Sequence, residues 1–170
     1  MQQQEKKSSP KKPPRVFGGT RLKIAYCVLF MVSVANLGFA FMDTSSDWYR
    51  QLLKPELMPP AIALPVAWTA LCALTAASMS LVNTHPGVRK KTLILYALTA
   101  VSGVLWIYVF FCRNNAGGAV FLLIAIIAAA GLLYSDAYRT SRTAAYLLIP
   151  CILWQCYTLY LNYEIAFFNP

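Results

Sequence analysis

The sequence predicts an all-α membrane protein, a bundle of five transmembrane helices with a long first connection. Of its 170 residues, 58% are apolar and only 12% are charged, which argues against an ordinary soluble domain. The apolar share would fill about five membrane spans of about 20 residues each. The 15 Lys and Arg residues stand in short stretches between apolar blocks, as is typical of the water-facing rims of a membrane protein.

The chain begins with a basic segment, residues 1–21, which we expect to be a disordered tail. Its residues are mostly polar or charged and include three prolines, so it cannot bury enough apolar surface to fold alone. It is rich in Lys and contains Glu5, unlike a cleaved mitochondrial presequence. The net charge of +9 would suit a nucleic-acid partner, but its division between apolar blocks leads us to expect none.

The remaining residues, 22–170, are expected to form one transmembrane domain. Its spans are predicted at about residues 22–42, 61–82, 92–112, 116–134 and 144–168. The first run is long for the core of a cleavable signal peptide, so we expect it to be retained. Pro65 and Pro150 are each expected about one turn inside a helix, which predicts helix starts near residues 61 and 146. Runs of this length differ from the short alternating strands of a β-barrel.

Residues 43–60 form the polar connection between the first two spans. The connection is long for a simple link and carries Trp48, Tyr49 and three prolines. Long connections of this kind are usually functional, and many close over a site. We therefore expect this segment to act as a lid.

The distribution of basic residues predicts an orientation. With five spans, the two termini lie on opposite sides, and the amino-terminal side then carries twelve Lys and Arg against three on the other side. The positive-inside rule places the amino terminus in the cytosol for a protein inserted by the secretory route. A protein delivered directly to a mitochondrial outer membrane need not follow that rule.

Few residues have the pattern of a catalytic or metal site. His85 has no Cys or carboxylate neighbour, and the five cysteines form no CxxC pair, so we expect neither a metal site nor a disulfide framework. Glu164 is expected to reach the membrane interface, with a ligand or proton role as the alternative. No nucleotide-binding loop or catalytic triad pattern is present. We expect no catalytic residues and no obligatory cofactor.

The aromatic residues are more informative. Trp68, Trp106 and Trp154 fall within the second, third and fifth predicted spans. Aromatic walls suit flat apolar ligands such as porphyrins and sterols, while the indole N–H groups supply a few oriented polar contacts. The alternative interpretation is that these residues belong to interfacial belts or to helix packing.

Three blocks carry a recognisable pattern. They are WYRQLLKPELMPPAIALPVAW from Trp48 to Trp68, WIYVFF from Trp106 to Phe111, and LLIPCILWQCYTLYLNYEIAFFN from Leu147 to Asn169. In order and spacing they resemble the tryptophan-rich sensory protein or translocator protein family, also called the peripheral benzodiazepine receptor family. With the five spans, the blocks cover nearly everything after the basic tail.

The resemblance implies an integral membrane receptor or carrier. Its ligands would be tetrapyrroles such as haem or protoporphyrin, or sterols such as cholesterol, bound in an intramembrane pocket and moved or sensed there. A homodimer, and a mitochondrial outer membrane or alternatively a secretory-pathway membrane, are implied in the same way. Two alternatives stay open. One is a porphyrin-degrading enzyme that uses Trp68 and Trp154 as radical participants, and the other is a structural protein that has lost the pocket.

Carried over by position, the resemblance assigns residues to a lid and to a pocket. The lid would be shaped by Trp48, Tyr49, Pro55, Pro59 and Pro60. The pocket would be lined by Trp68, Trp106, Phe110, Phe111, Trp154, Leu161, Asn162 and Tyr163.

The chain departs from the family pattern at several of these positions. Leu57 and Leu64 stand where the family usually has Trp and Phe, Tyr108 replaces a Pro, and Gly103 replaces a common Asn. The pocket is therefore expected to be less aromatic and less polar than in other members. A cavity filled by Leu57, Leu64 and Tyr108 would favour the structural alternative.

Overall fold

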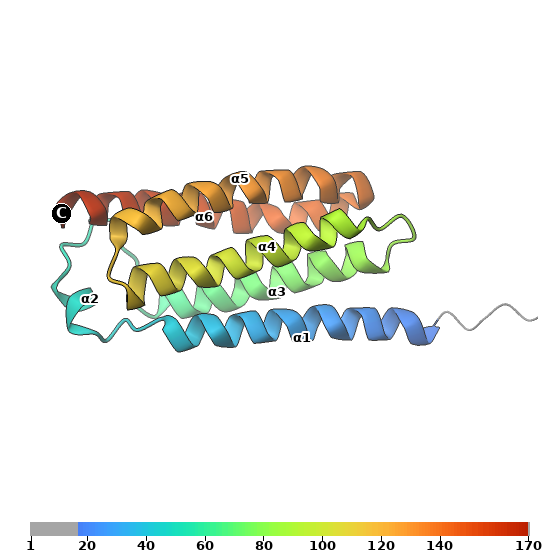
Figure 1. The fold of residues 1–170 in the computed structure, drawn as a ribbon, viewed down its shortest axis with the longest axis horizontal. Helices are drawn as coiled ribbons and strands as arrows, with labels where there is room; N and C mark the ends of the chain where they lie inside the picture. The colour runs from blue at the N-terminus through green and yellow to red at the C-terminus, as the bar shows by residue number, and fades with distance from the viewer. Residues whose placement is uncertain (1–16, 170) are drawn as a thin grey trace, which may run out of the picture.

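The computed structural model describes residues 17–169. Its elements, shown in Figure 1, are α1 (Phe17–Phe41), α2 (Asp47–Gln51), α3 (Ala63–Thr84), α4 (Lys90–Ile107), the π-helical segment η1 (Tyr108–Cys112), α5 (Ala116–Thr140) and α6 (Arg142–Phe168). Within the described residues, five helices are long and apolar enough to cross a membrane, which confirms the predicted five-helix class. Residues 1–16 of the predicted tail lie outside the described residues, whereas residues 17–21 belong to α1.

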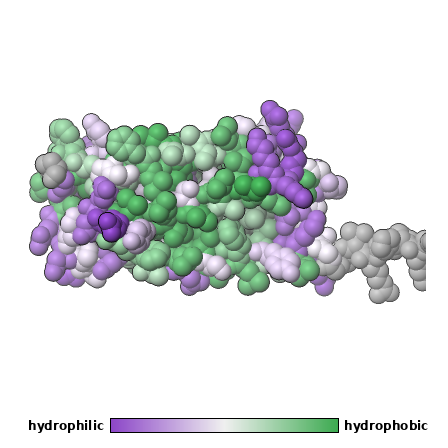
Figure 2. All heavy atoms as spheres, in the orientation of Figure 1, coloured by the Kyte–Doolittle hydropathy of each residue, from purple (hydrophilic) through white to green (hydrophobic). Residues whose placement is uncertain are grey.

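The long helices run side by side, and consecutive ones point in opposite directions (Figure 1). α5 packs along α6, α1 along α3, α3 against α6, and α4 against α5. Figure 2 shows an apolar middle zone with hydrophilic residues gathered at both ends. This distribution is what a bundle that crosses a bilayer requires, because the lipid core excludes polar side chains.

The two ends of the bundle differ in their connections. The loop end carries residues 42–62, which we call the first connection, and the turn between η1 and α5. The basic end carries the α3–α4 and α5–α6 turns, with Arg89 and Arg142. At the loop end Asn114 takes a positive φ of 50°, a conformation that Asn tolerates, and the chain reverses into α5. The Asn115 side chain then accepts the Gly118 N–H at 2.7 Å and caps α5.

Beyond the earlier start of α1, two further helix boundaries differ from the predictions. α5 continues past Tyr134 to Thr140 and so brings Asp136 inside the helix. α6 begins at Arg142, where the Ser141 side chain accepts the Ala144 N–H, so the predicted start near residue 146 is wrong. Pro150 therefore lies roughly two turns inside α6 rather than one.

A buried polar network joins four helices at the basic end. The Ser78 hydroxyl donates to the Ala144 carbonyl oxygen at 2.6 Å, so the Tyr96 hydroxyl, also 2.6 Å away, donates to Ser78. The Thr92 hydroxyl donates to one carboxylate oxygen of Asp136, and Arg89 pairs with the other oxygen at 3.2 Å. These partners explain why α5 can extend past Tyr134 with a carboxylate that is only 7% exposed.

Candidate ligand-binding cavity

A central cavity of about 90 Å³ lies among all five long helices. Three tryptophans from three helices meet at it, Trp68 from α3, Trp106 from α4 and Trp154 from α6. The rest of the wall is Met31, Val34, Leu71, Cys72, Thr75, Thr99, Ala100, Gly103, Leu123, Ile126, Cys151, Gln155 and Thr158. The three indoles that the sequence singles out therefore share one site.

The indole of Trp68 packs against Gly38 and Gly103, which leave room for it because they have no side chain. Its indole N–H donates to the Ala35 carbonyl oxygen of α1 at 3.2 Å. A Cβ added at Gly38 would overlap this indole, and one added at Gly103 would lie 3.3 Å from the ring atom Cη2. Gly103, a departure from the family pattern, thus gives the ring of Trp68 room beside α4.

Trp106 is oriented by Asn162. The indole N–H of Trp106 donates to Asn162 Oδ1 at 3.2 Å, and Asn162 Nδ2 donates to the Ala116 carbonyl oxygen at 3.0 Å. Asn162 is only 2% exposed and joins α4, α5 and α6. Among the residues assigned to the pocket, Asn162 thus acts through Trp106 and is not part of the cavity wall.

Two further residues assigned to the pocket lie away from the cavity wall. Leu161 is buried, and Tyr163 is 59% exposed. The Tyr163 ring stacks on Phe167 with a centroid distance of 6.5 Å. Neighbouring residues on a helix point in directions about 100° apart, so adjacent members of a sequence motif cannot all face one cavity.

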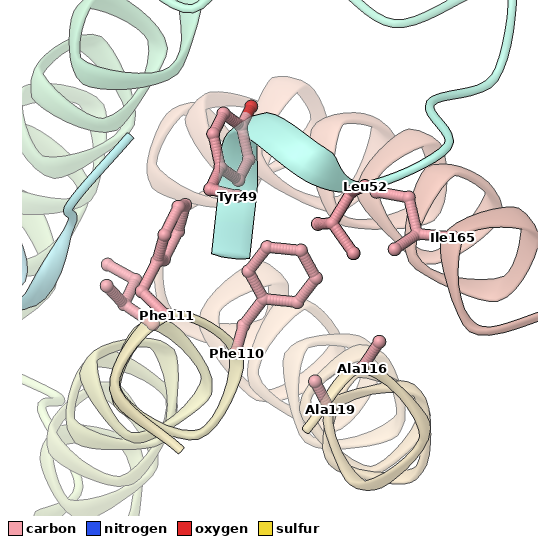
Figure 3. Close-up of a cluster of buried hydrophobic side chains, with 8 residues drawn as sticks. Tyr49, Leu52, Phe110, Phe111, Ala116, Ala119 and Ile165 are labelled. Carbon is pink, nitrogen blue, oxygen red and sulfur yellow. The ribbon is translucent and has the colours of Figure 1, made fainter. Parts of the chain in front are cut away.

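A second group of aromatic residues closes the loop end. Figure 3 shows Tyr49 and Leu52 of the first connection packed toward Phe110 and Phe111 of η1 and Ile165 of α6. The full loop-end cluster is Tyr49, Leu52, Ile107, Phe110, Phe111, Ala116, Ala119 and Ile165. Two consecutive phenylalanines, Phe110 and Phe111, are buried in the π-helical turn of η1. Burial raises the pKa of Tyr49 above its ordinary value.

The loop-end cluster reaches the cavity through a chain of rings. Trp48 contacts Phe110 edge to face at a centroid distance of 5.4 Å, and Phe110 stacks on Trp106 at 6.0 Å. Trp106 belongs to the cavity wall. Phe110 therefore connects the first connection with the cavity, although the assigned residues Phe110 and Phe111 do not themselves line it.

Two side chains of α6 and its end hold the first connection. Asn169 accepts the Leu53 N–H at 2.9 Å through Oδ1 and donates to the Leu53 carbonyl oxygen at 3.1 Å through Nδ2. The Tyr157 hydroxyl donates to the Leu57 carbonyl oxygen at 2.6 Å. Neither contact was predicted, because both join residues at least 100 positions apart in the chain.

The prolines assigned to the lid lie along the same connection. Pro55 is buried, Pro59 is half-buried and Pro60 is exposed. Pro60 also precedes α3, where its carbonyl oxygen accepts the Ala63 N–H at 2.8 Å. The prolines thus shape the path of the first connection toward α3.

The departures from the family pattern do not fill the cavity. Leu57 is 63% exposed and Tyr108 is also exposed, while Leu64 packs against the loop-end cluster. The criterion for a lost pocket is therefore not met by these residues. Instead, the indole of Trp68, which lies against Gly38 and Gly103, borders the cavity and limits its size.

Sequence reasoning missed Gln155, which follows Trp154 in α6. Its Oε1 atom is buried and has no hydrogen-bond partner among the described residues. The available signal was an amide side chain within an apolar run. Within residues 17–169, no group of three His, Cys, Asp or Glu residues is placed to hold a metal ion. His85 instead accepts the Gly87 N–H at 3.1 Å through Nδ1.

Residues 24–168 match the TspO/MBR family. Tryptophan-rich protein TspO of Bacillus cereus is 30% identical over 125 residues, which cover 72% of this chain and 80% of that protein. The translocator protein of Homo sapiens is 30% identical over 120 residues, which cover 68% of this chain and 71% of that protein. The tryptophan-rich sensory protein of Cereibacter sphaeroides is 26% identical over 118 residues, or 69% and 74% of the two chains.

Proposed function

Because the chain belongs to the TspO/MBR family, we propose that it is a membrane receptor or carrier that binds flat apolar ligands, tetrapyrroles or sterols, in its central cavity. The names of its relatives describe a translocator protein and a sensory protein. In this proposal the chain moves or senses its ligand, and the first connection acts as a lid. The proposed location is a mitochondrial outer membrane, with a secretory-pathway membrane as the alternative, and the proposed assembly is a homodimer.

The observation that carries the proposal is the meeting of Trp68, Trp106 and Trp154 at one cavity. Indole faces bind flat ring systems through broad dispersion contact, and such walls are typical of small-molecule sites. The cavity wall contains no Asp, Glu, His, Lys or Arg. Such a wall lacks carboxylate, imidazole and amine groups for acid and base catalysis, so binding is favoured over bond chemistry.

The ligand has to enlarge the site. Pockets for such molecules measure about 300–1,000 Å³, whereas this cavity measures about 90 Å³. A groove of about 470 Å³ between α1 and α3 shares Met31 and Cys72 with the cavity. Met has three flexible side-chain bonds, so a rotation of Met31 would join the groove to the cavity and admit a ligand from the lipid.

Equilibrium binding tests the proposal. Purified protein is titrated separately with protoporphyrin, followed by its absorbance, and with radiolabelled cholesterol. We expect saturable binding of at least one ligand and about tenfold weaker binding by Trp154→Leu, since an aromatic contact contributes about 0.5–1.5 kcal/mol beyond its buried area.

The matched control is Tyr163→Leu, which removes another aromatic ring of α6 but one that is exposed. Its affinity should equal that of the unmodified protein. A folded preparation that saturates with neither ligand contradicts the proposed function. Equal losses in both variants would move the site away from the cavity.

A further inference from the structure

Gln155 places an unpaired acceptor beside the cavity. Its side chain borders both the central cavity and a second cavity of about 60 Å³, whose walls share Thr75, Thr99 and Cys151 with the first. Gln155 Oε1 is buried without a hydrogen-bond partner among the described residues. A buried acceptor left unpaired costs about 1–3 kcal/mol, and the lipid core supplies no water to offset that cost.

Two of the three indole donors around the cavity are used within the protein. Trp68 donates to the Ala35 carbonyl oxygen, and Trp106 donates to Asn162 Oδ1. Neither N–H is therefore free to offset the unpaired oxygen of Gln155 or to bind an acceptor of a ligand.

The hydroxyl donors of the wall are used in the same way. Thr75, Thr99 and Thr158 each donate to a carbonyl oxygen of their own helix, at 2.8, 2.9 and 2.8 Å. A hydroxyl whose proton is used still accepts through its oxygen. These three hydroxyl groups therefore offer a ligand only acceptors.

We propose that Gln155 is the specificity-determining residue of this cavity and accepts a hydrogen bond from the hydroxyl group of a neutral apolar alcohol. The inference rests on the proposed function and narrows its ligand class. A ring or chain of carbon atoms would lie against the tryptophans, and its single hydroxyl would pair with Gln155 Oε1.

Tetrapyrroles fit this wall less well. Their carboxylates are bound most strongly by cations, and neither Lys, Arg nor His lines the cavity. Their central N–H groups lie in the ring plane, where a side chain facing the ring cannot reach them with good geometry. A sterol or a linear isoprenoid alcohol carries an accessible hydroxyl donor at one end of an apolar body.

Two steroids that differ at the donor, and otherwise only in the position of one ring double bond, test this contact. Cholesterol carries a hydroxyl at one ring position, where cholest-4-en-3-one carries a ketone, which only accepts. We expect the full chain to bind cholesterol about tenfold more tightly than the ketone, equivalent to one well-formed hydrogen bond. In Gln155→Leu, which has a side chain of similar size, the two affinities should be equal because cholesterol binding has weakened.

The ligand-free protein supplies a second readout. Since Gln155→Leu removes an unpaired acceptor, its thermal unfolding midpoint should be equal to or higher than that of the unmodified protein. A lower midpoint would show that Oε1 already has a partner and would overturn the inference. A cholesterol preference that persists in Gln155→Leu would overturn it as well.

Two further comparisons show whether the inference alone fails or the proposed function fails with it. They also show which kind of alcohol binds. If both steroids bind equally to the unmodified chain, the inference fails and the proposed function stands. If neither steroid, nor farnesol, nor protoporphyrin binds, both fail. Farnesol, a linear isoprenoid alcohol, separates the two alcohol sources: binding of cholesterol alone assigns a sterol, and binding of farnesol alone assigns a linear alcohol.

Discussion

At the basic end, Ser78, Tyr96 and Asp136 join the helices through hydrogen bonds. At the loop end the ring contacts of Tyr49 and Phe110 predominate, beside one hydrogen-bonded side chain, Asn162. Hydrogen bonds are directional, so the basic end fixes the relative positions of α3 to α6. Apolar ring contacts are less directional and tolerate small displacements. We therefore expect the cavity to widen toward the loop end when a ligand enters, while the basic end acts as the fixed base.

The largest effect should come from the basic end. Asp136→Ala leaves the buried Thr92 hydroxyl without its acceptor and should lower the free energy of unfolding by about 1–3 kcal/mol. The measurement is unfolding in mixed micelles. Adding Thr92→Val removes the stranded hydroxyl and should recover part of the loss. If Asp136→Ala alone is as stable as the unmodified protein, this network does not fix the helix positions at the basic end.

The next largest effect should come from the packing of Trp68 against Gly38. Gly38→Ala places a methyl group where the indole lies, so it should lower the free energy of unfolding by about 1–3 kcal/mol and shift the tryptophan emission. Gly131→Ala is the matched control, because an added Cβ there meets no atom within 4 Å. Equal stability of the two variants would show that Trp68 is not confined at Gly38.

A local effect is expected in the first connection. Asn169→Ala removes both hydrogen bonds to Leu53, each worth about 1 kcal/mol net. Hydrogen exchange of the Leu53 amide should become at least about tenfold faster, while exchange at the basic end stays unchanged. Unchanged protection of Leu53 would mean that other contacts hold this segment.

The smallest effect concerns a turn at the start of the first connection. The side-chain hydrogen bond from Ser45 to Asp43 Oδ1, at 2.6 Å, is the main cause that lowers the pKa of Asp43 below its ordinary value. A lowered pKa in the fold means that the turn keeps its full stabilisation above the unfolded value, about 3.9, and loses it as pH falls through the lower folded value. An NMR titration should show the pKa of Asp43 raised toward its ordinary value in Ser45→Ala, and an unshifted Asp43 in the unmodified chain would refute the contact.

Much of the fold was predictable because each membrane span can be recognised from its own stretch of sequence. Runs of about 20 apolar residues predict helices directly, since an unpaired backbone cannot cross a bilayer. The predicted end of α5 came too early because Asp136 is charged. Its partners Arg89 and Thr92, which allow its burial in the helix, come from a distant segment. The predicted start of α6 rested on Pro150, whereas the helix begins at the Ser141 cap.

The candidate site was predictable only in part. The family pattern identifies Trp68, Trp106 and Trp154, which do line one cavity. The pattern cannot indicate that Tyr163 faces away, because orientation depends on which face of α6 packs inward. The sequence marks Gln155 only as an amide within an apolar run. That its oxygen is unpaired depends on neighbours in space, which the sequence does not give.

The central claim, that the cavity among the three tryptophans is the ligand site, is tested most directly by filling it. Ala100 of α4 lines the cavity, whereas Ala128 of α5 is exposed, so Ala100→Phe and Ala128→Phe add the same ring inside and outside the site. The measurement is the equilibrium affinity for whichever of protoporphyrin and cholesterol binds the unmodified protein more tightly. Ala100→Phe should lose at least about tenfold in affinity while keeping its helix content, and Ala128→Phe should lose none. Equal affinities for the two variants and the unmodified chain would contradict the claim.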